Sequence, residues 1–247
     1  MRFFIKLSYK GTNYHGWQIQ PNANTIQQEI NKAISLVLNE EIQVIGAGRT
    51  DTGVHAKKMF AHFDYNIEFQ IEHIIYKLNS LLPSDITVLS IFKVREDANS
   101  RFDALSRTYQ YNVINRKDPF NMNAYLVKKA LDLEVMNQAC QYIIGKKDFS
   151  SFSKANTQTF TNNCDVTFAN WELADCGYIF TIKSNRFLRN MVRAIVGTLI
   201  DVGFSKISPD SLFSIIAAKD RSFSGTSVPA CGLFLMDIEY SKEIIIK

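Results

Sequence analysis

An aspartate stands in a permissive stretch of the sequence, GAGRTDTGVHA, which covers residues 46–56. Asp51 follows Arg49 by two residues, and three glycines surround the pair. A nearby guanidinium favours the ionised form of a carboxylate, and glycine lets a ligand approach the backbone closely. The stretch therefore suits a nucleophilic or basic carboxylate held on a loop between two strands.

Other interpretations compete for the same loop. A dinucleotide-binding fingerprint needs a third glycine where Asp51 stands, and a P-loop needs a Gly-Lys-Ser/Thr sequence that is absent. A metal site could use Asp51, His55 and His62, but lone histidines beside strands are usually packed or hydrogen-bonded, so we expect no metal. A hairpin loop whose Asp51 accepts backbone hydrogen bonds explains the residues equally well. Composition cannot choose between this loop and a catalytic carboxylate.

Hydrophobic periodicity predicts the elements that position the loop. In the first half we expect strands over 2–9, 41–47, 54–65 and 85–94, and helices over 25–38 and 71–83. In the second half we expect strands over 107–114, 164–173, 177–184 and 232–240, and helices over 132–145, 185–203 and from 208 onward. Both halves read as βαββαβ, the ferredoxin-like order. The prediction is an α+β (mixed α/β) fold with halves 1–100 and 101–247 on a largely antiparallel sheet.

Two patterns in the second half could serve a ligand. In RTYQY, Tyr109 and Tyr111 share a strand face, for which core packing is the default interpretation. The helix expected over 185–203 places five polar residues within an arc of roughly 140°: Asn185, Arg186, Arg189, Asn190 and Arg193. Three arginines on one stripe repel each other unless an anion lies nearby. The stripe therefore indicates an anion-binding cleft or a solvated helix face.

The overall composition fits a globular protein with a mild basic excess. The chain has 247 residues, of which 46% are hydrophobic and 21% charged, and this excludes a disordered chain. A net charge of +4 permits a polyanionic partner without requiring one. Lys6 interrupts the apolar N-terminus and no long apolar run follows, so we expect neither a signal peptide nor a membrane span. Four cysteines without a CxxC pair indicate a reduced, cytoplasmic protein.

Seven sequence blocks carry a resemblance that bears on these alternatives. In chain order they are YKGTNYHGWQIQ, GAGRTDTGVHA, LNSLLPSDI, RFDALSRTYQY, DFSSF, NRFLRNMVRAIVG and GLFLMDIEY. In these blocks and their order the chain is similar to the TruA family of bacterial tRNA pseudouridine synthases, and the central GRTD-GVHA block is highly specific. The similarity spans nearly the whole length. Two positions differ from that family's usual pattern. Lys10 stands where the family often has an acidic residue, and Thr52 stands where it often has alanine.

The resemblance implies a pseudouridine synthase fold and an isomerase that acts on tRNA without a cofactor. It further implies action in the anticodon stem-loop, at positions 38, 39 and 40, by a homodimer. The alternatives are a catalytically silent RNA-binding module on the same fold and a hydrolase that acts on nucleosides. No feature of the sequence tells whether the catalytic carboxylate attacks the sugar, attacks the base or removes a sugar proton.

Roles for single residues also come from the resemblance. Asp51 resembles the essential aspartate, and Tyr109 resembles the tyrosine that stacks on the target base. Arg49 resembles an arginine that helps to displace that base, and Arg193 the arginine that pairs with the catalytic carboxylate. We therefore predict a guanidinium nitrogen of Arg193 within about 4 Å of an Asp51 carboxylate oxygen. Further substrate-binding residues are expected at three positions: Arg107, Arg186 and Arg189.

Overall fold

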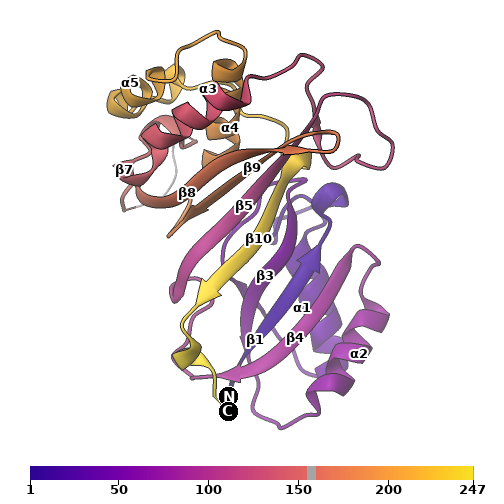
Figure 1. The fold of residues 1–247 in the computed structure, drawn as a ribbon. Coiled ribbons are helices and arrows are strands. Elements are labelled where there is room, and N and C mark those ends of the chain that lie inside the picture. The colour runs from indigo at the N-terminus through magenta and orange to yellow at the C-terminus, as the bar shows by residue number, and fades with distance from the viewer. Residues whose placement is uncertain (155–159, 247) are drawn as a thin grey trace. The chain divides into compact units, whose positions relative to one another are not determined.

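The computed structural model describes residues 1–154 and 160–246, which form ten strands and five α-helices (Figure 1). Within each of the two compact units of the chain, strand pairing is antiparallel except between β10 (Leu233–Tyr240) and β3 (His55–Asp64) and between β5 (Ala104–Ile114) and β6 (Tyr125–Leu126). The predicted mixed α/β fold class is confirmed. The chain divides into two compact units, residues 1–105 with 234–247 and residues 106–233. Sequence order places the last strand in the second half, whereas its pairing with β3 places it in the first unit.

The first unit follows the predicted βαββαβ order. Its elements are β1 (Arg2–Tyr9), α1 (Ile26–Leu38), β2 (Ile45–Gly46), β3 (His55–Asp64), α2 (Ile71–Leu81), β4 (Ile86–Val94) and, from the end of the chain, β10 (Leu233–Tyr240). Strand β1 lies between β3 and β4 and is antiparallel to both. Strand β10 extends this sheet beside β3. The short β2 pairs with β3 and leads directly into the glycine loop.

Helix α1 shows how the sequence encodes these elements. Thr25 is extended, and its hydroxyl accepts a hydrogen bond from the Gln28 N–H, as expected of an N-cap. Ile26, Ile30 and Ile34 recur every four residues and are all buried. Each buried side chain of this size stabilises the fold by about 1.5–3 kcal/mol. Burial of this stripe therefore contributes far more to the helix than the cap does.

The second unit has two short strands that periodicity did not predict. Its elements are β5 (Ala104–Ile114), β6 (Tyr125–Leu126), α3 (Leu133–Cys140), β7 (Gly145–Asp148), β8 (Asn163–Ala174), β9 (Gly177–Ser184), α4 (Met191–Gly203) and α5 (Ser211–Ala218). The strands lie in the order β5, β9, β8, β7, with β6 beside β5. Strands β8 and β9 form the expected hairpin. None of the described helices is long and apolar enough to cross a membrane.

The helix expected from Asn185 begins only at Met191, so that prediction is wrong. Asn190, just before the helix, has φ = 68°, which interrupts any helical run. Asn185 is tied to Asp165: its N–H donates to the Asp165 carbonyl oxygen at 3.2 Å, and its Oδ1 accepts from the Asp165 N–H at 2.9 Å. The predicted polar arc therefore does not exist. Arg186 and Arg189 lie before the helix, and only Arg193 lies on it.

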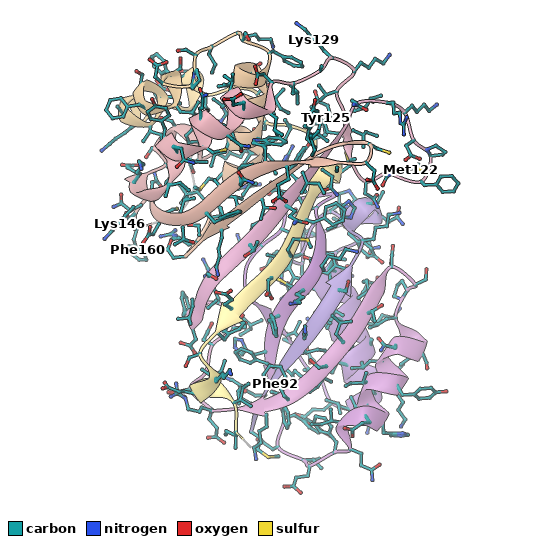
Figure 2. The ribbon with its side chains drawn as sticks, viewed as in Figure 1. Phe92, Met122, Tyr125, Lys129, Lys146 and Phe160 are labelled. Atoms are coloured by element: carbon teal, nitrogen blue, oxygen red, sulfur yellow. The ribbon has the colours of Figure 1, made fainter. Side chains whose placement is uncertain are left out.

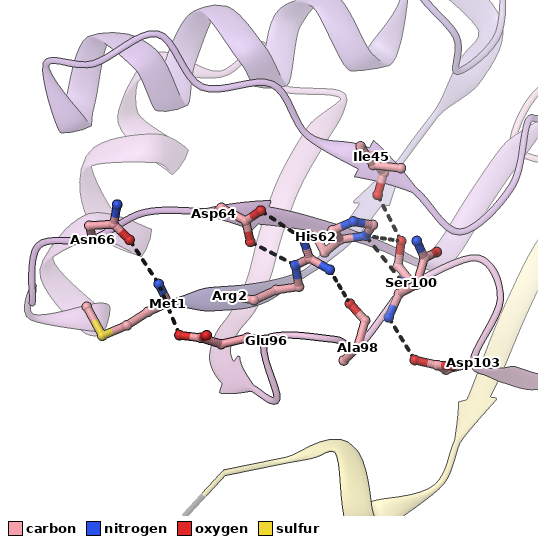
Figure 3. Close-up of polar contacts among 11 residues, drawn as sticks. Met1, Arg2, Ile45, His62, Asp64, Asn66, Glu96, Ala98, Ser100 and Asp103 are labelled. Atoms are coloured by element: carbon pink, nitrogen blue, oxygen red, sulfur yellow. Dashed lines mark hydrogen bonds and ion pairs between the residues drawn. The ribbon is translucent and has the colours of Figure 1, made fainter.

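A polar network secures the segment after β4 to the sheet of the first unit (Figure 3). The Arg2 guanidinium donates to both Asp64 carboxylate oxygens, at 2.7 and 2.8 Å, and to the Ala98 carbonyl oxygen at 3.0 Å. The Nδ1 atom of buried His62 accepts the Ser100 N–H at 3.2 Å. Burial, and then the positive charge of Arg2, lowers the pKa of His62. The ring is therefore neutral in the folded chain near neutral pH.

Candidate active site

The Asp51 loop is held through its backbone by residues from the start of the chain. The Trp17 N–H donates to the Thr50 carbonyl oxygen at 3.2 Å, and the Gly53 N–H donates to the Tyr14 carbonyl oxygen at 3.3 Å. Within the loop, the Val54 N–H donates to the main-chain oxygen of Asp51 at 3.1 Å. These bonds fix the peptide groups on both sides of Asp51. A carboxylate that attacks or deprotonates a substrate needs a backbone that is held in place in this way.

The three glycines of the loop have different reasons to be glycine. Gly53 has φ = 79°, which other residues rarely adopt. A Cβ atom at Gly46 would collide with the Trp17 indole. A Cβ at Gly48 would meet no atom within 4 Å in the part of the chain that the structure describes. Of the three glycines, Gly53 is therefore the one that positive φ explains.

Arg49 and Asp51 differ in their exposure. Asp51 is half-buried, and the Thr50 residue between them is buried. Arg49 is exposed and forms no ion pair within residues 1–154 and 160–246. The loop therefore directs the arginine toward solvent, where it can meet an incoming polyanion, while the aspartate lies deeper.

The two histidines considered as metal ligands, His55 and His62, both accept hydrogen bonds from backbone N–H groups. The Nδ1 atom of His55 accepts the Gly11 N–H at 3.0 Å, and the His55 ring lies 4.6 Å from the Phe234 ring, centroid to centroid. His62 uses Nδ1 in the same way on Ser100. Among the described residues, no three His, Cys, Asp or Glu side chains converge on a possible metal position.

Tyr109 and Tyr111 of β5 share a strand face but have different surroundings. Tyr111 is fully buried, and its hydroxyl donates to the Pro229 carbonyl oxygen at 2.7 Å. Burial is the main cause that raises the pKa of Tyr111. Tyr109 is only half-buried, and the Phe187 ring stands nearly perpendicular to it at 5.2 Å. Core packing therefore accounts for Tyr111, whereas Tyr109 keeps part of its ring accessible.

Arg193 lies in the first turn of α4, and one of its nitrogens is fixed by the chain segment that precedes β10. Its Nε donates to the Val228 carbonyl oxygen at 2.7 Å, while the Val228 N–H donates to the Arg193 carbonyl oxygen at 3.2 Å. A Cβ at Gly197, one turn later, would collide with the Thr226 carbonyl oxygen, so the segment packs directly on the helix. The Tyr111 hydroxyl holds the same segment at Pro229. The plane of the guanidinium is thereby set.

The other predicted arginines lie beside the end of β9 or just beyond it. Arg107, on β5, donates from a terminal nitrogen to the Asn185 carbonyl oxygen at 2.7 Å. Arg186 follows directly and is half-buried, while Arg189 is exposed and its carbonyl oxygen accepts the Lys154 N–H at 3.1 Å. Lys146 on β7, labelled in Figure 2, adds an exposed cation to the same unit. Such cations suit phosphate groups.

Comparison with known proteins identifies the chain. A family model described as tRNA pseudouridine synthase matches residues 6–103 and 139–241. The chain belongs to the tRNA pseudouridine synthase family. This is an isomerase family, and membership confirms the resemblance seen in the seven sequence blocks.

Individual relatives of this pseudouridine synthase family member match over almost their whole length. A protein named tRNA pseudouridine synthase A from Parabacteroides distasonis is 49% identical over 247 residues, covering 98% of this chain and 97% of the relative. One of the same name from Bacteroides thetaiotaomicron is 48% identical, with 98% and 92% covered. A third, from Thermoanaerobacter pseudethanolicus, is 42% identical over 242 residues, with 96% and 98% covered.

Sequence reasoning missed the residues that hold the site. Tyr14 and Trp17 hold the Asp51 loop, and Val228 holds Arg193. In both cases the residues in contact are far apart along the chain. The only signal was that Tyr14 and Trp17 lie in one conspicuous block, YKGTNYHGWQIQ. No spacing rule connects that block to the glycine loop.

Proposed function

We propose that this pseudouridine synthase family member isomerises uridine in the anticodon stem-loop of tRNA, at positions 38, 39 and 40. The N1–C1′ bond of the nucleotide breaks, the base turns, and a C5–C1′ bond forms. The C5 proton passes to water and N1 takes up a proton, so the product is an isomer. No electron leaves or enters, and we expect no cofactor. The proposal includes a homodimer that acts in the cytoplasm.

Asp51 is the proposed catalytic carboxylate. The observation that carries this assignment is the backbone support of its loop, which fixes the peptide groups on both sides of Asp51. Cleavage of a glycosidic bond develops positive charge on the sugar, which an ionised carboxylate stabilises. The same carboxylate can attack the sugar, attack the base or remove a sugar proton, and each route needs it ionised. Half-burial leaves it within reach of a nucleotide.

Tyr109 is the proposed stacking platform for the displaced uridine. A base in a stacked stem or loop leaves its neighbours at a cost of a few kcal/mol. Stacking on an aromatic ring returns about 1–3 kcal/mol per base. The perpendicular Phe187 ring limits the rotation of the half-buried Tyr109 ring, so little entropy is lost when a base stacks on it.

The arginines have distinct proposed roles. Arg193 pairs with Asp51, and its fixed Nε aims the remaining guanidinium nitrogens before substrate arrives. Exposed Arg49 helps to displace the target base from the stack. Substrate phosphates are bound by three further arginines: Arg107, Arg186 and Arg189.

Release of tritium from tRNA labelled at C5 of uridine tests the function, because C5 loses its hydrogen only when it becomes the glycosidic carbon. We expect release from a tRNA with uridine at positions 38–40, and none when cytidine replaces those uridines. A catalytically silent RNA-binding module would bind both tRNAs and release no tritium. A hydrolase would instead liberate free uracil. Either result would contradict the proposal.

A further inference from the structure

Thr50 is the residue directly before the proposed catalytic aspartate, and it points away from solvent. Thr50 is 8% exposed and Tyr9, at the end of β1, is 4% exposed. Their hydroxyl oxygens, Oγ1 of Thr50 and Oη of Tyr9, lie 2.9 Å apart in a buried hydrogen bond. A side chain so placed does not reach an RNA substrate. Its effect on the reaction therefore passes through the backbone to Asp51.

The backbone around Thr50 is also confined from outside. Gly16 has φ = 91°, and a Cβ atom there would collide with the Thr50 carbonyl oxygen and lie 3.2 Å from the Asp51 carbonyl carbon. The same Thr50 oxygen accepts the Trp17 N–H. The residue before Asp51 is thus held by its carbonyl group on one side and by its hydroxyl group on another.

We propose that Tyr9 and Thr50 are positioning residues, whose buried hydroxyl pair fixes the direction in which Asp51 presents its carboxylate. This inference rests on the proposed role of Asp51. A catalytic group must be positioned to within a fraction of an ångström, because a displacement of about 1 Å can lower the rate about a hundredfold. Loss of the hydroxyl pair leaves the backbone bonds of the loop in place but removes the restraint on the Thr50 side chain.

Three substitutions test the pair. Thr50→Val keeps the shape of the side chain and removes its hydroxyl, Thr50→Ser keeps the hydroxyl, and Tyr9→Phe removes the partner. We expect Thr50→Val and Tyr9→Phe to lower kcat by about tenfold or more, with KM and tRNA affinity unchanged within a few-fold. Thr50→Ser should retain most of kcat. The double variant, Tyr9→Phe with Thr50→Val, should be no slower than the slower of the two single variants, because both substitutions remove the same hydrogen bond.

Matched controls separate positioning from loss of stability. Tyr65→Phe removes another buried phenol of the first unit, whose hydroxyl donates to the Leu38 carbonyl oxygen at 3.2 Å. Thr87→Val makes the same threonine change at an exposed position of β4. Both controls should keep the wild-type kcat, and unfolding of every variant is followed in urea. If Thr50→Val does not fold, Thr50→Ser and Tyr9→Phe decide.

A wild-type kcat in folded Tyr9→Phe and Thr50→Val would overturn the inference. So would a Thr50→Ser variant as slow as Thr50→Val. Failure of the proposed function has a different signature, since the wild-type protein would then release no tritium. Failure of the proposed role of Asp51 is distinct again, since Asp51→Ala would then keep its activity whatever happens at Thr50.

Discussion

Replacement of Arg193 by lysine separates the charge of this residue from its geometry. The wild-type guanidinium donates through Nε to the Val228 carbonyl oxygen at 2.7 Å, and its terminal nitrogens are the proposed donors to Asp51. Lysine keeps the positive charge but carries a single ammonium group. That group cannot hold the Val228 carbonyl and present two parallel donors to a carboxylate. Arg193→Lys should therefore bind tRNA normally and react slowly.

The size of the effect follows from the bonds that are lost. A hydrogen bond to a charged group contributes about 1.5–3 kcal/mol, and a loss of this size in the transition state lowers the rate roughly 10- to 150-fold. The Val228 carbonyl also loses its side-chain donor, which destabilises the fold by about 1–3 kcal/mol. We therefore expect a lower Tm together with a lower kcat.

Tritium release at saturating tRNA measures kcat, and thermal unfolding reports stability on the same samples. Arg2→Lys is the control, because Arg2 also bridges two acceptors, Asp64 and Ala98, in the network of Figure 3. This control should lose stability and keep its kcat. A folded Arg193→Lys enzyme with kcat within about twofold of wild type would refute the role given to the guanidinium geometry.

Three further predictions concern the base, the phosphates and pH. Tyr109→Phe should keep most activity and Tyr109→Ala should lose far more in the same tritium assay; equal activity of Tyr109→Ala and wild type would leave the ring a structural role only. The logarithm of tRNA affinity should fall steeply with the logarithm of salt concentration, and a flat plot would exclude phosphate-driven binding. Folding lowers the pKa of His62. As the pH falls, the His62 side chain therefore takes up a proton more readily in the unfolded chain than in the folded chain. Stability in urea should thus be constant above about pH 6.5 and decline below it, and an unchanged slope in His62→Asn would contradict this origin.

Elements governed by nearby residues were predictable from sequence. Thr25 accepts from the backbone three residues later, and Asp132 caps α3 by accepting the Val135 N–H at 3.1 Å. The turn between β8 and β9 likewise depends on neighbouring residues. In each case the stabilising partner lies within a few positions, so the pattern contains the information.

Elements governed by distant residues were not predictable. The start of α4 depends in part on the bonds between Asn185 and Asp165, 20 positions apart, which no periodicity reveals. Strands β6 and β7 are too short to show an alternation of polar and apolar residues. They form because each pairs with a longer strand, β6 with β5 and β7 with β8. The supports of the candidate site belong to the same class. Tyr9 meets Thr50, and Val228 meets Arg193, only because the sheet and the helix bring them together.

The catalytic role of Asp51 is tested most directly by the activity of the Asp51→Ala enzyme on C5-labelled tRNA. The substitution removes the carboxylate and leaves the bonds made by the loop backbone in place. We predict that pseudouridine formation disappears while tRNA affinity stays within a few-fold of wild type, because phosphate contacts made elsewhere supply most of the binding. A folded Asp51→Ala enzyme that retains more than about a hundredth of the wild-type rate would contradict the assignment of Asp51 as the catalytic carboxylate.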